Sequence, residues 1–370
     1  MDKIYMPILK AKDSEFKALE FTRENVSNRI VPLFDISDPN TNLKGYIKSE
    51  TPKCDYINKI VKKIAKYRQN LPVLFDGHGW FDNTYTETNE HVYTYMYRKL
   101  AEAGSRPIPV VGYDRWELPD YKQAVKSVNN RGACLIRLDS YAFEDASDPD
   151  YFLTHINDIL FELKVSANNC ALYLDFGDLS NSSILDITEI ASNILELTSH
   201  YEFKFYIIAG CSMPSYINGA VKNPDSASTL LRKEAIAWKA MRGNFPKLNV
   251  IFGDYGVRGP NSAPPGTKAK DMNGKLRYTI QNELFVSRGH PQTAPDKWRQ
   301  MVQVCDRVVK SGYFIGPSFS WGDKYLYDCS IGEAHPGGAG LWIAVDTNHH
   351  MAFVVSEITE ELAKTLPVAA

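Results

Sequence analysis

The stretch of sequence that decides the fold runs from Ala171 to Ala209 and reads ALYLDFGDLSNSSILDITEIASNILELTSHYEFKFYIIA. It begins with one short apolar run, Ala171–Phe176, and ends with another, Phe203–Ala209. Neither run alternates apolar with polar residues, which is typical of strands buried on both faces of a parallel sheet. Between them, Ile184–Leu197 repeats apolar residues at a helical spacing. The stretch therefore predicts one strand–helix–strand unit of a parallel sheet.

Similar units lie on both sides of this stretch. The other apolar runs are short and rich in Val, Ile, Leu and aromatic residues; they are Ile4–Leu9, Ile30–Ile36, Leu71–Phe75, Ile108–Val111, Ala133–Leu138 and Leu248–Phe252. Amphipathic segments separate the runs, most clearly Asp55–Gln69, Asp150–Ser166 and Ser226–Met241. Eight strand–helix units predict an α/β fold, a (β/α)8 TIM-like barrel over residues 1–256. An open doubly wound sheet is the alternative, but no GxGxxG motif follows the first run.

The pattern changes after residue 256. Residues 257–274 are rich in Pro, Gly and Lys and have no apolar period, which predicts a mobile loop. The remaining segments predict a C-terminal α+β extension over 257–370 that caps the barrel as a lid. Its expected elements are an extended segment at Leu276–Ser287, a helix at Asp296–Lys310, strands at Tyr313–Phe319 and Leu341–Val345, and a final helix at Met351–Lys364.

Composition excludes several classes of protein. The chain has 370 residues, with 42 Lys and Arg against 44 Asp and Glu, so its formal net charge is −2. This balance excludes a globally basic nucleic-acid binder, although a local basic patch stays open. The six cysteines form no CxxC pair, which favours buried free thiols over a zinc site. With neither a signal sequence nor a membrane-length apolar stretch in view, we expect a cytoplasmic protein without membrane association.

Charged side chains follow most of the predicted strands, at the end where barrel enzymes carry their active sites. Four carboxylates, Asp35, Asp76, Asp175 and Asp254, would converge there. Carboxylates packed together raise one another's pKa unless a cation lies among them. A divalent metal such as Mg²⁺ held by these four residues is one solution, and pairing with Lys10 and Arg137 is the other. Strand-end Asp residues also serve as turn and helix-cap residues.

If the mouth is catalytic, we predict that Asp76, Asp175, Asp254 and His349 take part in the chemistry. The residues predicted to bind substrate carry charges or aromatic rings; they are Lys10, Arg137, Tyr255, Arg258, Arg277, Trp321, Asp323 and His350. Plainer interpretations stay open, because two adjacent histidines on a helix point in different directions and Ser320–Asp323 could be a simple turn. The basic residues of 257–277 could clamp the phosphates of a nucleotide or nucleic acid, or stay solvated.

Several motifs, taken in order, resemble one known family. They are YMPILKAKDSE (5–15), VPLFDI (31–36), LRKEAIAW (231–238), VIFGDYG (250–256), LRYT (276–279), SFSWGD (318–323) and LWIAVDTNHHMAFVV (341–355). The ordered set resembles the phage and bacterial beta protein family from Tyr5 to Val355. The matching residues are Lys10, Glu15, Arg232, Glu234, Trp238, Gly253, Asp254, Tyr255, Arg277, Tyr278, Thr279, Trp321, Gly322, Asp323, Asn348, His349 and His350. The resemblance implies a setting in phages or in bacterial loci linked to mobile elements or defence, and it supplies no catalytic roles.

Two hypotheses of function follow. The first is a hydrolase of phage–host conflict, metal-assisted, that acts on a phosphate-containing substrate such as a nucleotide or nucleic acid. The alternative is a non-catalytic protein that sequesters or inhibits a nucleotide or a phage or host protein. A structural role in a larger complex stays open. We expect no nicotinamide, flavin or haem. Aromatic residues near the expected mouth and lid, among them Tyr255 and Trp321, suit a flat or sugar-like ligand.

Overall fold

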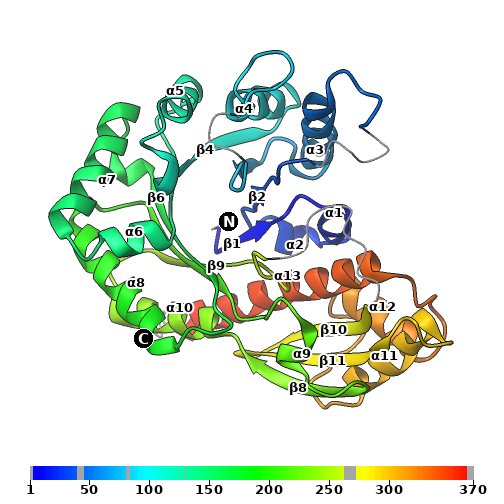
Figure 1. The fold of residues 1–370 in the computed structure, drawn as a ribbon. Coiled ribbons are helices and arrows are strands. Elements are labelled where there is room, and N and C mark those ends of the chain that lie inside the picture. Colours follow the sequence, from blue (N-terminus) through cyan, green and yellow to red (C-terminus); the bar gives the residue numbers. More distant parts are fainter. Residues whose placement is uncertain (1–2, 40–45, 81–83, 130, 262–271, 365–370) are drawn as a thin grey trace.

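The computed structural model describes residues 3–39, 46–80, 84–129, 131–261 and 272–364. Eight parallel strands close into a barrel in the order β1-β2-β3-β4-β5-β6-β7-β9 (Figure 1). Their bounds are β1 (Tyr5–Leu9), β2 (Leu33–Asp35), β3 (Pro72–Asp76), β4 (Arg106–Gly112), β5 (Leu135–Leu138), β6 (Ala171–Asp178), β7 (Phe205–Cys211) and β9 (Val250–Asp254). The predicted barrel is confirmed, and each of the eight apolar runs overlaps one of its strands.

Helices surround the barrel strands (Figure 1). They are α1 (Asp13–Glu20), α2 (Glu24–Ser27), α3 (Pro52–Arg68), α4 (Val92–Glu102), α5 (Pro119–Val128), α6 (Ser140–Asp145), α7 (Pro149–Leu163), α8 (Ile184–Thr198) and α10 (Lys233–Asn244). The short helix α9 (Ile217–Ala220) lies instead beside the strand β8 (Ser226–Leu231) of the small sheet. In α7, the Asp148 side chain accepts a hydrogen bond from the Tyr151 amide (3.3 Å), and Pro149 occupies the first turn. Both features favour a helix start at this point.

Side chains on the barrel strands alternate between two apolar layers. On β6, Tyr173 belongs to the cluster inside the barrel, whereas Leu172 and Leu174 belong to the cluster under the helices. Strand side chains repeat with a period of two, so Asp175 shares the inward face with Tyr173. This alternation determines which strand-end residues reach the mouth.

The C-terminal part forms a second, smaller layer. β10 (Asn273–Ile280) and β11 (Glu283–Pro291) make an antiparallel sheet in the order β10-β11-β8, and α11 (Met301–Val309) and α12 (Trp321–Ser330) pack near it. The long helix α13 (Ala339–Lys364) runs between the barrel and this sheet (Figure 1). No helix within the described ranges is long and apolar enough to cross a membrane.

The predicted helix at Ser226–Met241 is wrong over its first third. Ser226–Leu231 is the strand β8, which pairs antiparallel with β11, and the helix α10 begins only at Lys233. The pairing joins residues more than fifty positions apart, so local periodicity could not indicate it. β8 precedes residue 257 in the chain, so the small sheet takes one strand from inside the predicted barrel segment.

Two predicted strands of the extension are also wrong. Tyr313–Phe319 has no regular structure, and both Gly312 and Gly316 adopt positive φ angles, 81° and 115°. Leu341–Val345 belongs to α13, which begins twelve residues before the predicted Met351. A short apolar run fits a buried helix as well as a strand. Of the predicted loop 257–274, residues 262–271 lie outside the described part of the chain.

Candidate functional site

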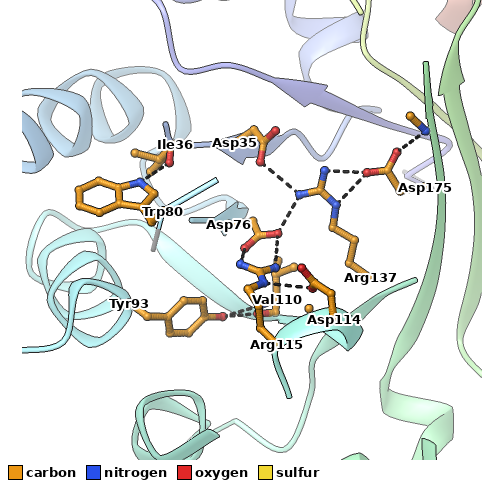
Figure 2. A network of polar contacts seen from close by, with 12 residues as sticks. Asp35, Ile36, Asp76, Trp80, Tyr93, Val110, Asp114, Arg115, Arg137 and Asp175 are labelled. Atoms are coloured by element: carbon orange, nitrogen blue, oxygen red, sulfur yellow. Dashed lines mark hydrogen bonds and ion pairs between the residues drawn. The ribbon is translucent and has the colours of Figure 1, made fainter. Parts of the chain in front are cut away.

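Arg137, near the end of β5, is the centre of a buried polar network in the barrel mouth (Figure 2). Its guanidinium donates to Asp35 (Nη1–Oδ1, 3.1 Å) and to Asp76 (Nη1–Oδ2, 2.7 Å). It also donates twice to Asp175 Oδ2, from Nε at 2.9 Å and from Nη2 at 2.6 Å. The three carboxylates come from β2, β3 and β6, whose carboxyl ends meet at one end of the barrel.

A second arginine, Arg115, completes the pairing of Asp76. Its Nη1 and Nη2 donate to the two carboxylate oxygens at 3.0 and 3.1 Å, which is the bidentate geometry. Burial alone would raise the pKa of Asp76, but attraction by Arg115 and Arg137 outweighs burial and holds that pKa below its ordinary value. The Arg115 side chain passes close to the backbone of Gly112. A Cβ atom at position 112 would collide with the guanidinium, so glycine is needed there.

Lys10 and Tyr255 extend the network. The Lys10 ammonium lies 3.4 Å from Asp35 Oδ2 and donates to the Pro260 carbonyl at 3.0 Å. The Tyr255 hydroxyl donates to Asp175 Oδ2 at 2.6 Å and accepts from Arg137 Nη2 at 3.1 Å. Three cations thus face the three carboxylates. Lys10 and Arg137 thus pair with these acids, which is the geometry that one of the two predicted solutions describes.

Asp254 lies in a different cluster. Its neighbour Gly253 faces the barrel interior, where a Cβ atom would meet Tyr173 and Ile207. Asp254 therefore points the opposite way, toward α13, where Tyr5 donates to it at 2.5 Å and His350 Nε2 lies 2.8 Å from its Oδ2. The structure does not bring Asp254 to Asp35, Asp76 and Asp175. In the chain as described, no group of three or more His, Cys, Asp or Glu side chains is arranged to hold a metal ion.

The two adjacent histidines point to different partners, as a helix requires. His350 Nδ1 lies 2.7 Å from the Thr279 hydroxyl, so His350 bridges β10 and Asp254 of β9. His349 Nδ1 lies 2.9 Å from Asp323 Oδ2, and its Nε2 lies 2.9 Å from the Thr279 carbonyl. Both rings are at most 2% exposed. The histidine contacts join α13 to the barrel, β10 and α12, and neither ring reaches the mouth network.

Two further predicted residues lie on α12. Asp323 is completely buried and accepts from the Tyr278 hydroxyl at 2.7 Å as well as pairing with His349. Trp321 stacks on Phe21, with ring centroids 4.4 Å apart and an interplanar angle of 10°. Neither residue contacts the mouth network, so the twelve predicted catalytic and binding positions divide among separate clusters.

A group of basic side chains gathers where the mouth meets the C-terminal sheet. Lys12 precedes α1, Arg258 follows β9, and Lys275 and Arg277 lie two residues apart on β10. We call these four residues the basic seam. Arg277 bonds Asp346 of α13 (3.1 Å), yet its Nε is buried with no hydrogen-bond partner. In the described residues, Arg258 and Lys275 have neither an ion pair nor a side-chain hydrogen bond.

Mutual repulsion in the basic seam is visible in the pKa values. Burial, followed by the charges of Arg277 and Arg258, lowers the pKa of Lys275 to about 7. Burial and then Arg277 also lower the pKa of Arg258. Two buried acids lie beside the seam. Burial raises the pKa of Asp346 to about 7 although Arg277 opposes the shift, and burial also raises the pKa of Glu15.

The residues predicted to form the site do not include Arg115, Lys12 or Asp346. Arg115 carries a signal in the sequence, because the glycine three residues before it leaves room for a long side chain to fold back. Asp346 carries none, because it directly follows the predicted strand Leu341–Val345 and only the helix α13 brings it to Arg277. Lys275 was expected only as one member of a basic loop, whereas it lies on β10 and is partly buried.

Comparisons with known proteins agree with the motif resemblance. The family model described as Beta protein matches residues 5–356. No curated protein sequence matches the chain significantly. Among solved structures, one that is similar is Yersinia pestis DHPS with a pterine-sulfa conjugate; the match has 15% identity and a TM-score of 0.39 and covers 69% of this chain and 88% of that chain.

Proposed function

The chain belongs to the Beta protein family, and from this premise we propose that it binds a phosphate-containing ligand, a nucleotide or a nucleic-acid backbone, at the basic seam. One observation carries the proposal: Arg258 and Lys275 are partly buried cations without a partner in the described residues. Buried charges are normally paired, because an isolated charge loses its hydration without compensation. An anionic ligand would supply the missing partner.

The chemistry of the basic seam fits a phosphate group. A guanidinium offers a planar pair of donors and an ammonium offers a compact charge, and both bind phosphate oxygens. The unpartnered Nε of Arg277 adds one more buried donor. A dianion next to Lys275 would raise its pKa again, so binding and protonation of this lysine are coupled.

Binding without turnover is favoured by the state of the mouth carboxylates. Asp35, Asp76 and Asp175 all pair with Arg137, and two of them pair with a second cation as well. The pKa of Asp76 lies below its ordinary value because of Arg115 and Arg137, so Asp76 is poorly suited to accept or donate a proton near neutral pH. Sequestration of a phosphate-containing ligand is therefore the function that the geometry supports best.

Hydrolysis is the second candidate, and one observation favours it. Asp346 is a buried carboxyl group with a pKa of about 7, hydrogen-bonded to Arg277 of the basic seam. A carboxyl group with such a pKa could exchange a proton with a phosphate ester at neutral pH. A divalent metal such as Mg²⁺ would then arrive bound to the phosphates of the substrate. Release of inorganic phosphate from a bound nucleotide would distinguish this function from sequestration.

Isothermal titration with pyrophosphate tests the proposed site. We expect Arg258→Gln and Lys275→Gln each to weaken binding about tenfold or more, because each removes a charge-assisted hydrogen bond. Lys275→Gln should leave the fold at least as stable, since it removes a repelled cation. Lys310→Gln is the matched control, because Lys310 is a surface residue with 74% of its side chain exposed. Equal affinity of all four proteins, or no binding by the wild type, would refute the proposal.

The pKa of Lys275 predicts how binding depends on pH. Lys275 is charged below about pH 7 and neutral above it, so affinity should fall as the pH rises. We expect a loss of roughly tenfold between about pH 6.5 and 8.5. Sulfate is a suitable probe, because its own charge does not change in this range. An affinity that stays constant or rises would contradict the assignment of Lys275, and Lys275→Gln should abolish the dependence.

The motif resemblance to the phage and bacterial family supports a proposed biological setting. We place this activity in phage–host conflict in the cytoplasm, with a nucleotide or nucleic acid as the sequestered ligand and a phage or host protein as the alternative partner. Mass spectrometry of small molecules released from the purified protein by denaturation would identify a nucleotide that copurifies. Recovery of a stoichiometric protein instead would favour the alternative.

A further inference from the structure

We propose that a second ligand site lies beside α13, in a cavity that takes a small organic anion with a planar ring. The cavity has a volume of about 660 Å³. Three separate parts of the chain form it: residues 21–29 after α1, residues 318–321 before and at the start of α12, and the face of α13 from Asn348 to Glu360. None of the four basic-seam residues lines it, so this site is independent of the proposed function.

The size of the cavity suits a small molecule. Ligand pockets in proteins usually enclose several hundred cubic ångströms and combine an apolar lining with a few polar groups that orient the ligand. Val26, Ala352 and Val355 supply apolar lining here, and Arg23 and Arg29 are among the polar residues of the lining.

The charge of the cavity wall favours an anion. Arg23 donates to the Ser318 carbonyl (2.6 Å) and Arg29 donates to the Thr359 hydroxyl (2.5 Å), and both acceptors are neutral. Neither arginine has an ion-pair partner in the described residues, and the Nε of Arg29 is buried without a hydrogen bond. One carboxylate, that of Glu360, also lines the cavity. Two arginines against one acid leave a net positive wall, which complements a carboxylate or phosphate group.

The aromatic side of the cavity favours a planar ring. One face of Phe21 stacks on Trp321, while 42% of Phe21 remains exposed. Phe319 lines the cavity as well. A ring that covers the exposed part of Phe21 would bury apolar surface and stack in the arrangement that aromatic pairs prefer.

The floor of the cavity is held rigidly. Asn348 accepts from the Gly322 amide (2.9 Å) and donates to the Ala18 carbonyl (3.0 Å), so its side chain ties α13 to both α12 and α1. Its polar atoms are thereby used within the protein. A ligand would be oriented by Arg23 and Arg29, in a cavity whose shape exists before binding.

Fluorescence and calorimetric titration with 2-naphthoate test the site, with 2-naphthalenemethanol as the uncharged analogue. We expect 2-naphthoate to bind with a dissociation constant below about 1 mM and the alcohol to bind at least about tenfold more weakly. Arg29→Gln, Arg23→Gln and Phe21→Ser should each weaken naphthoate binding severalfold, whereas Lys275→Gln should not change it. Pyrophosphate should not displace the ligand.

The exposed Arg23 keeps the test informative if the Arg29 variant does not fold. No binding of 2-naphthoate at about 5 mM, equal binding of acid and alcohol, or unchanged affinity in the folded Arg23 and Phe21 variants would each overturn the proposal. A loss of affinity in Lys275→Gln would also overturn it, because the ligand would then occupy the basic seam.

Discussion

Replacing Arg137 by Met is expected to lower the free energy of unfolding by about 5 kcal/mol, the largest effect of any single substitution considered for this chain. Met has a similar length but no charge, so Asp35, Asp76 and Asp175 would all lose their shared partner. All three are at most 7% exposed. A loss of this size is comparable to the whole stability of many domains. Chemical denaturation followed by circular dichroism measures it.

The pH dependence of this loss identifies its cause. Without Arg137 the buried carboxylates would be ionised only at a cost, so their pKa values in the folded state would rise. Protonation at low pH would then relieve the repulsion, and the difference from the wild type should shrink as the pH falls from about 7 to 5. The free energy of unfolding of Arg137→Lys should lie between those of the wild type and Arg137→Met, because lysine keeps the charge but not the planar donors.

Arg98→Met is the matched control for Arg137→Met. Arg98 also bonds two carboxylates, Glu90 and Glu102, but 43% of its side chain is exposed. Exposed ion pairs contribute little, so we expect a change below about 1 kcal/mol. If Arg137→Met were as mild as Arg98→Met, the mouth network would contribute no more than a surface pair, and the interpretation given above would fail.

Gly322→Ala is expected to destabilise the C-terminal part by about 3 kcal/mol. A Cβ atom at Gly322 would lie under 3.0 Å from the Val345 carbonyl oxygen, and neither that oxygen nor the His349 amide can move away without shifting α13. Separating α12 from α13 would weaken the Gly322–Asn348 bond and the contact of His349 with Asp323. Thermal unfolding followed by tryptophan fluorescence reports the change.

Gly243→Ala is the control for this substitution. Gly243 lies inside α10, and a Cβ atom there would meet no heavy atom within 4 Å. Alanine favours helix over glycine, so this variant should be equal to the wild type or up to about 1 kcal/mol more stable. A similar response of both variants would show that crowding between α12 and α13 is not the cause.

The barrel could be predicted because its evidence is local. Each of the eight strands overlaps a run of mostly apolar residues, and each run can be recognised in the sequence without reference to any other. The small sheet could not be predicted in the same way. β8 has exposed or partly exposed side chains, and only its pairing with β11 makes it a strand. The apolar run Leu341–Val345 fits a strand as well as a helix, and its position within the long helix α13 makes it helical.

The candidate site could also be predicted only in part. The sequence shows which charged residues stand at the strand ends. It also offers Lys10 and Arg137 as partners for the acids, and both residues form ion pairs in the mouth. Their grouping was not visible, because it depends on the face of each strand. Asp254 ends β9 as Asp76 ends β3, yet Gly253 takes the inward position and turns Asp254 toward His350. A difference of one position along the strand thus separates the mouth network from the cluster of Asp254 and His350.

The sequence by itself determined the barrel, the residues available at its mouth and the family, since each of these depends on residue type and order alone. The tertiary structure decided which charges meet. Arg137 forms ion pairs with three carboxylates, whereas Arg258 and Lys275 have no partner in the described residues. The physical reason is that electrostatic pairing depends on distances of a few ångströms between side chains far apart in the chain. Neither composition nor periodicity contains those distances.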